Sequence, residues 1–237
     1  MSNIGYPVEP SPQIAGGIGS VPARTVAAPA IATHALPWRP AALVAGPVLV
    51  TAGFALHPVG AEDGTAFVRA VAAHPSGWAV AHLLIFAGLL ALIAAVPLVL
   101  DLAPHRGRRI VHAGIAALSV GAIAMAVDAV AHGYLAYVLA GRHDVGAGLS
   151  AAIETHAAST SWASTASALG ALFPLGVVLI AVGCVRAGVS KLVAASLVAG
   201  VVGIGMVGAG PATVLSTAPL VLGFAGLARA WMVRSRL

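Results

Sequence analysis

The sequence predicts an all-α integral membrane protein, a bundle of six transmembrane helices with both termini cytoplasmic and a disordered N-terminal tail. Two observations support this fold class. Of the 237 residues, 59% are hydrophobic and only 8% are charged, whereas a soluble domain needs about 25% charged residues to cover its surface. The apolar residues also form six runs, each near the roughly 20 residues that a helix needs to cross a bilayer. Most of the surface is therefore expected to face lipid.

The formal net charge of +5 does not indicate a nucleic-acid-binding protein. The basic residues form short clusters at the ends of the apolar runs, which is typical of a membrane protein and not of a surface that follows phosphates. The single cysteine, Cys184, excludes an intrachain disulfide and a cysteine-based zinc motif. We expect the lipid bilayer as a partner, together with other membrane subunits or further copies of the chain, and no nucleic acid.

Residues 1–36 are rich in Pro, Ala and Gly, and their only charged residues are Glu9 and Arg24. They lack the basic segment and continuous apolar run of a secretory signal. We therefore predict a disordered cytoplasmic tail, followed by a six-helix transmembrane domain over residues 37–237.

Few charged residues interrupt the six apolar runs, and we place the spans at about 40–56, 77–100, 110–135, 165–185, 192–209 and 212–231. The first run follows Trp38 and Arg39, an aromatic and a basic residue typical of the membrane interface. The second begins beside Trp78, which we interpret as another interfacial anchor. Four runs contain a proline, which bends a helix or frees a carbonyl group: Pro47, Pro97, Pro174 and Pro219.

The segments between the spans also carry signals. Residues 63–73 can form a short amphipathic helix, and residues 149–162 fit an interfacial helix or an extension of the fourth span. The third run stays apolar to about Ala140, so its last turns are expected to project beyond the hydrocarbon. The loop over 101–109 is short and strongly basic, which makes it the best single marker of the cytoplasmic side.

The distribution of basic residues sets the orientation. With both termini inside, only Arg69 and Arg142 of the twelve Lys and Arg residues lie outside. The opposite orientation reverses a ten-to-two bias, which the positive-inside rule strongly disfavours. We predict a multi-pass protein of the plasma or inner membrane. The ten inner residues are Arg24, Arg39, Arg106, Arg108, Arg109, Arg186, Lys191, Arg229, Arg234 and Arg236.

The third span carries the only carboxylate deep in an apolar run, Asp128, and His132 follows one helical turn later. At 100° per residue, the face centred on Asp128 also carries small residues, namely Gly114, Ala117, Gly121 and Ala124. The opposite face carries bulky ones, namely Val120, Ile123, Val127, Val130 and Tyr134. Small residues suit close helix contact and bulky residues suit lipid. Asp128 and His132 are therefore expected to point into the bundle.

In this orientation six of the nine histidines lie at the outer side: His57, His74, His82, His132, His143 and His156. Histidine is the commonest side-chain metal ligand and also ligates haem iron. Asp128 and His132 project from one helix face, as the paired ligands of a helical zinc motif do, and His82 lies at a similar depth. We predict an outward-facing metal site made of His82, Asp128 and His132, with His57 as the fourth candidate, that binds a single divalent ion.

In a second version of this site, His82 and His132 bind a b-type haem between two helices. Either cofactor predicts a redox or metal-handling role. Two other functions stay open. A proton-coupled transporter would use Asp128 as its titrating group and the helix-breaking prolines as flexible points. A cofactor-free helical subunit would dock onto a larger membrane complex through its small-residue faces. No residue is assigned a catalytic role.

Each site residue also has a plainer interpretation. Asp128 and His132 can pair with each other and with a hydroxyl such as that of Thr165 or Ser167. His82 can meet the lipid headgroups at the interface. His57, His74, His143 and His156, together with Glu154, fit solvated loop positions.

Overall fold

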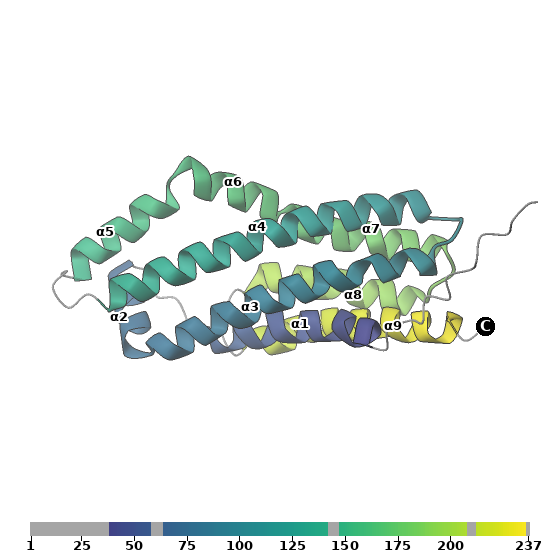
Figure 1. The fold of residues 1–237 in the computed structure, drawn as a ribbon, viewed down its shortest axis with the longest axis horizontal. Coiled ribbons are helices and arrows are strands. Elements are labelled where there is room, and N and C mark those ends of the chain that lie inside the picture. Colours follow the sequence, from purple (N-terminus) through teal and green to yellow (C-terminus); the bar gives the residue numbers. More distant parts are fainter. Residues whose placement is uncertain (1–37, 58–63, 142–146, 208–211, 236–237) are drawn as a thin grey trace, which may run out of the picture. The chain divides into compact units, whose positions relative to one another are not determined.

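The computed structural model describes residues 38–57, 64–141, 147–207 and 212–235, which are helical and contain no β-strand. The predicted tail of residues 1–36 lies outside this range. The elements shown in Figure 1 are α1 (Trp38–Leu56), α2 (Gly64–Ala73), α3 (Pro75–Ala95), the 3₁₀ helix η1 (Val96–Leu102), α4 (Arg108–Ala140), α5 (Ala147–Ala158), α6 (Ser161–Gly170), α7 (Leu172–Arg186), α8 (Lys191–Val207) and α9 (Thr213–Arg234). The short helix predicted over 63–73 is α2.

Four helical segments of the described chain are long and apolar enough to cross a membrane: Pro75–Leu102, Arg108–Ala140, Ser164–Arg186 and Thr213–Arg234. They correspond to the second, third, fourth and sixth predicted spans. The first and fifth predicted spans are shorter apolar helices, Pro40–Leu56 and Lys191–Gly205. The all-helical fold class is thus confirmed. Four long apolar helical segments are typical of a multi-pass membrane protein, because helices satisfy their own backbone hydrogen bonds in lipid.

Two of the four prolines lie where helices end or change type. The fourth predicted span is two helices, because Pro174 cannot donate the hydrogen bond that an unbroken helix would give to the carbonyl of Gly170. Pro97 has the same effect at the end of α3, where the chain tightens into η1. Pro47 and Pro219 instead lie inside α1 and α9, which continue through them.

Glycines bring α4 and α7, side by side in Figure 1, into backbone contact. A Cβ atom on Gly121 would lie 2.7 Å from the Cα of Phe173, and one on Gly114 would lie 2.9 Å from the carbonyl oxygen of Gly176. Gly176 in turn lies against the backbone of Leu118. No side chain fits at these glycines, so Gly114 and Gly121 of the predicted inner face form the close contact of α4 with α7.

Most of the helical-wheel prediction for α4 is confirmed, although Ala117 and His132 are only half-buried. The five bulky residues of the opposite face, Val120, Ile123, Val127, Val130 and Tyr134, are all exposed. Gly114, Gly121 and Ala124 are buried. Asp128 shares their face but is exposed, because the helices around it leave a cavity at its level.

The remaining helices enclose one continuous apolar core. α1 packs on α3 and α9, α4 packs on α3 and α7, and α8 contacts α7 and α9. Cys184 belongs to this core as a free thiol that is 1% exposed. A second, smaller apolar cluster of Val71, Trp78 and Ala136 lies where α2, α3 and α4 meet.

Side-chain contacts define two ends of the bundle. At one end the imidazole of His57, just after α1, lies 4.5 Å from the indole of Trp78, near the start of α3 (ring centroids). We call this the histidine end. At the other end the indole N–H of Trp231 in α9 donates a hydrogen bond to the Asp101 carboxylate in η1, with an N–O distance of 2.9 Å. We call it the arginine end, because Arg106, Arg186 and Arg234 lie there.

Candidate functional site

Trp78 is the buried side chain around which the histidine end packs. Its side chain is 0% exposed, and its indole N–H donates to the carbonyl oxygen of Gly133 over 2.8 Å, which ties the start of α3 to α4. Gly133 is required there because a Cβ atom would lie 2.6 Å from the Cγ of His82. The Trp78 and His82 rings, one helical turn apart, lie 4.3 Å from each other. The tryptophan predicted as an interfacial anchor is therefore a buried contact between two helices.

Three of the four predicted site residues meet around Trp78. The imidazole of His82 lies 5.0 Å from that of His57 and 6.2 Å from that of His132, measured between ring centroids. The indole of Trp78 lies 5.8 Å from the ring of His132. We call these four residues the histidine–tryptophan cluster. They come from the end of α1, from α3 and from α4.

The hydrogen bond of His82 does not by itself mark a metal ligand. Its Nδ1 lies 3.0 Å from the carbonyl oxygen of Trp78. Because a carbonyl only accepts, Nδ1 donates in this contact. His112, exposed near the start of α4, makes the same contact with the carbonyl of Arg108 at 3.0 Å. A histidine in a helix can thus form this hydrogen bond with the backbone carbonyl four residues earlier without being part of a site.

The predicted ligand set is divided between two places. Asp128 lines a cavity that includes none of the three histidines. His82 lines a separate groove of about 240 Å³, together with Gly133, Tyr134 and Tyr137 of α4. Among the residues that the structure describes, no group of three or more His, Cys, Asp or Glu side chains is arranged to hold a metal ion. The predicted single-ion site gains no support from this geometry.

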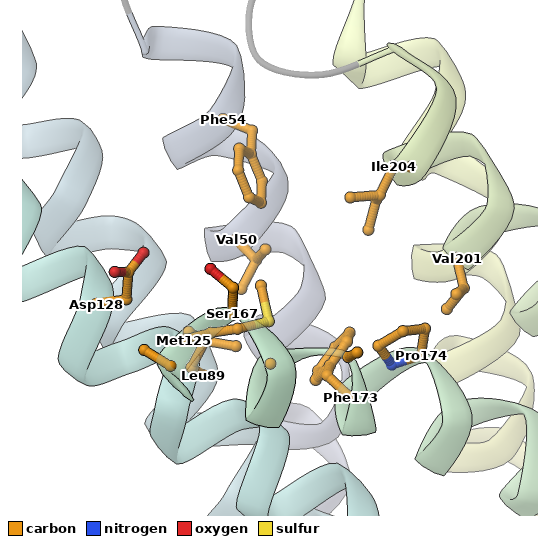
Figure 2. Close-up of a pocket in the computed structure, with 14 residues that line it drawn as sticks. Val50, Phe54, Leu89, Met125, Asp128, Ser167, Phe173, Pro174, Val201 and Ile204 are labelled. Atoms are coloured by element: carbon orange, nitrogen blue, oxygen red, sulfur yellow. The ribbon is translucent and has the colours of Figure 1, made fainter. Parts of the chain in front are cut away.

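Figure 2 shows the cavity at Asp128, which measures about 340 Å³. Residues of α1, α3, α4, α6, α7 and α8, and Ala171 between α6 and α7, line it: Val50, Phe54, Leu89, Met125, Asp128, Ala166, Ser167, Gly170, Ala171, Phe173, Pro174, Val201, Ile204 and Gly205. Asp128 is the one ionisable residue in this lining, and Ser167 contributes a hydroxyl group. The volume falls within the range of about 300–1,000 Å³ that small-molecule sites occupy. We call it the Asp128 cavity.

Two further predicted outer residues, His74 and His156, line neither the groove at His82 nor the cavity at Asp128. His156 and His74 are exposed, which agrees with their interpretation as solvated positions. His143 lies outside the described residues. Ser167, predicted as a plain partner of Asp128, does line the same cavity.

Two signals in the sequence point to the residues missed by the prediction. Trp78 and His82 are four residues apart, so both side chains lie on the same face of the helix. A residue that faces the lipid headgroups and a ligand that faces the bundle interior would lie on different faces. Pro174 lies just after the break between α6 and α7, and it lines the cavity beside Asp128 together with residues of both helices.

No protein-family model matches the chain, and neither a curated protein nor a solved structure is significantly similar to it. The histidine–tryptophan cluster and the Asp128 cavity are therefore the features from which we infer a function.

Proposed function

We propose that the protein is a proton-coupled membrane carrier that binds a lipophilic, positively charged molecule in the Asp128 cavity. One observation supports this above all: a single carboxylate lines a cavity of about 340 Å³ whose only other polar side chain is the hydroxyl of Ser167. A carboxylate inside a membrane span normally has a partner, because it costs up to about 2.5–3.5 kcal/mol on insertion scales, with the maximum at the bilayer centre. A cationic group of the ligand supplies that partner, and the apolar wall holds the rest of the molecule.

The histidine–tryptophan cluster would supply the proton. His132 lies one helical turn beyond Asp128 on α4, and His82 and His57 continue from it toward the histidine end. Chains of histidine and carboxylate side chains are typical of proton relays in transporters. A proton and a cationic ligand would compete for the same carboxylate. Binding of one would therefore release the other, which couples their movements in opposite directions.

In this proposal the chain crosses the membrane six times, with both termini cytoplasmic and the histidine end outside. The first and fifth spans would be α1 and α8, whose 19 and 17 residues fall within the 17–25 that suffice for crossing. The end of α1 and the start of α3 share the histidine end, whereas η1 and the end of α9 share the arginine end. The ten-to-two bias of basic residues assigns the arginine end to the cytoplasm.

Binding of a matched pair of ligands tests the proposal. The purified protein in mild detergent should bind phenethylammonium more tightly than neutral 2-phenylethanol, as measured by calorimetric titration. Asp128→Asn keeps the shape of the side chain but removes its charge. It should weaken binding of the cation at least about tenfold, because a contact to a charged group contributes about 1.5–3 kcal/mol. It should leave binding of the alcohol nearly unchanged.

Asp101→Asn is the matched control, because Asp101 lies at the arginine end, outside the cavity. In vesicles with an imposed pH difference, uptake of the cation should follow the proton gradient in the wild type and in Asp101→Asn but not in Asp128→Asn. Equal binding of both ligands by the wild type, or uptake by a folded Asp128→Asn variant, would contradict the carrier function.

A metal or haem protein is the second candidate, favoured by the gathering of three imidazoles from three segments in one cluster. His82 and His132 would be the haem ligands, or with His57 the ligands of a divalent ion. Stoichiometric metal, or a visible absorption band that shifts with dithionite, should then be present in the wild type and lost in His82→Ala. His112→Ala provides the control. A featureless spectrum without bound metal eliminates this candidate.

A further inference from the structure

A basic pocket of about 460 Å³ lies at the arginine end, away from the Asp128 cavity. Its lining includes three arginines and a histidine, namely Arg106, His105, Arg186 and Arg234, with Asp101 as the one acidic residue. These side chains come from the loop before α4 and from the ends of η1, α7 and α9. Residues from distant parts of the sequence thus present positive charge to one space.

Hydrogen bonds hold the walls of this pocket together. The guanidinium group of Arg234 donates to the carbonyl oxygen of Leu102 and, over 3.1 Å, to that of Ala187. It therefore joins the end of α9 to the ends of η1 and α7. The indole N–H of Trp231 donates to the carboxylate of Asp101. These hydrogen bonds fix the backbone frame of the pocket, and Arg106 and Arg186 are exposed at its rim.

The positive charge of the pocket is not neutralised within the described chain. Three guanidinium groups face one carboxylate, and none of the described acidic side chains forms an ion pair with Arg106, Arg186 or Arg234. Arginines gathered in this way match the geometry of phosphate oxygens, which accept two parallel hydrogen bonds from one guanidinium group. The pocket therefore suits a phosphate group from outside the chain.

The position of the pocket favours a lipid as the source of that phosphate. The pocket lies where apolar helices end, which is the depth of the headgroups in a bilayer. Met232 and Val233, just before Arg234, are exposed apolar residues, and Val233 is 55% exposed. Such residues can contact acyl chains while the arginines contact the headgroup. Basic pockets between helices on the cytoplasmic side are known to bind anionic lipid headgroups.

We propose that the pocket of Arg106, Arg186 and Arg234 binds the phosphate headgroup of an anionic phospholipid. This inference does not depend on the carrier function, because the pocket and the Asp128 cavity share no residue.

Titration of the full-length protein in mild detergent with dioleoylphosphatidylglycerol tests the inference, with dioleoylphosphatidylcholine, a zwitterion of zero net charge, as the comparison. Native mass spectrometry should show one tightly bound phosphatidylglycerol and weaker phosphatidylcholine. The double variant Arg106→Gln/Arg186→Gln should lower the affinity for phosphatidylglycerol about 25-fold, at about fivefold for each basic residue removed. Arg234 is left intact, because its hydrogen bonds hold the helix ends.

The control Arg109→Gln/Arg229→Gln removes the same charge from exposed residues that do not line the pocket, and its affinity should stay within about twofold of the wild type. An equal loss in this control would show diffuse surface attraction and overturn the proposal. Inorganic phosphate and glycerol 3-phosphate should compete only weakly with the lipid. If either bound as tightly as phosphatidylglycerol, the pocket would be a site for soluble phosphate and the lipid assignment would be wrong.

Discussion

Replacing Trp78 with alanine is expected to lower the free energy of unfolding by about 3–5 kcal/mol, the range for truncation of a buried aromatic side chain. Trp78 is 0% exposed and contacts the rings of His57, His82 and His132. Its removal takes away the surface against which the histidines pack, and also the hydrogen bond to Gly133. Thermal unfolding in detergent, followed by circular dichroism, measures the loss of stability.

Two further variants separate the causes of this effect. Trp78→Phe keeps most of the ring but loses the indole N–H, so it should cost about 1 kcal/mol. Trp38→Ala changes a side chain that is 50% exposed and should cost less than about 1 kcal/mol. Acylation by diethylpyrocarbonate should modify His82, which is 8% exposed, faster in Trp78→Ala than in the wild type. Equal stability of the Trp78 and Trp38 alanine variants would show that the cluster does not hold the histidine end together.

The second large effect is expected at the contact between α4 and α7. Gly121→Ala and Gly176→Ala should each lower the free energy of unfolding by about 1–3 kcal/mol, as overpacking of a tight contact does. The added methyl groups would meet the backbones of Phe173 and Leu118, which cannot rotate away as a side chain can. The whole helix must shift instead. The double variant should lose less stability than the two single variants together, because the helix shift forced by the first methyl group makes room for the second.

Gly148→Ala in α5 is the control for these variants. A Cβ atom there meets nothing within 4 Å, so the change should stabilise the helix by up to about 0.5–1 kcal/mol through the lower backbone entropy of alanine. Replacing glycine with alanine thus lowers the free energy of unfolding at the contact of α4 and α7 and raises it in α5. A destabilisation of similar size at Gly148 would show that the effect at Gly121 and Gly176 has nothing to do with the contact of the helices. Thermal midpoints in detergent distinguish these outcomes.

Much of the fold follows from the sequence, because hydropathy depends on local composition. The segment from Pro75 to Leu102 is apolar by its own composition, independently of the helices that pack against it. Its position was therefore predictable within a few residues. The lipid face of α4 was also predictable, since bulky residues such as Ile123 recur at helical spacing. The break between α6 and α7 was not placed, because a proline such as Pro47 can equally lie inside an unbroken helix.

The candidate site was predictable only in part. His57, His82 and His132 were expected at one end of the bundle, and the structure brings their rings together. The cavity beside Asp128 is lined in part by α6, which ends at a helix break that the sequence alone does not place. Trp78 was misplaced because an interfacial anchor and a buried contact have the same local sequence pattern.

Cys184, the only cysteine of the chain, is buried in the apolar core. The native protein is therefore expected to react very slowly with maleimide reagents, which need an accessible thiolate. A cysteine introduced at an exposed position, such as His74 at the histidine end or Arg109 near the arginine end, becomes the dominant reactive thiol without prior removal of the native one. The topology of the bundle can thus be mapped chemically on an otherwise unaltered protein.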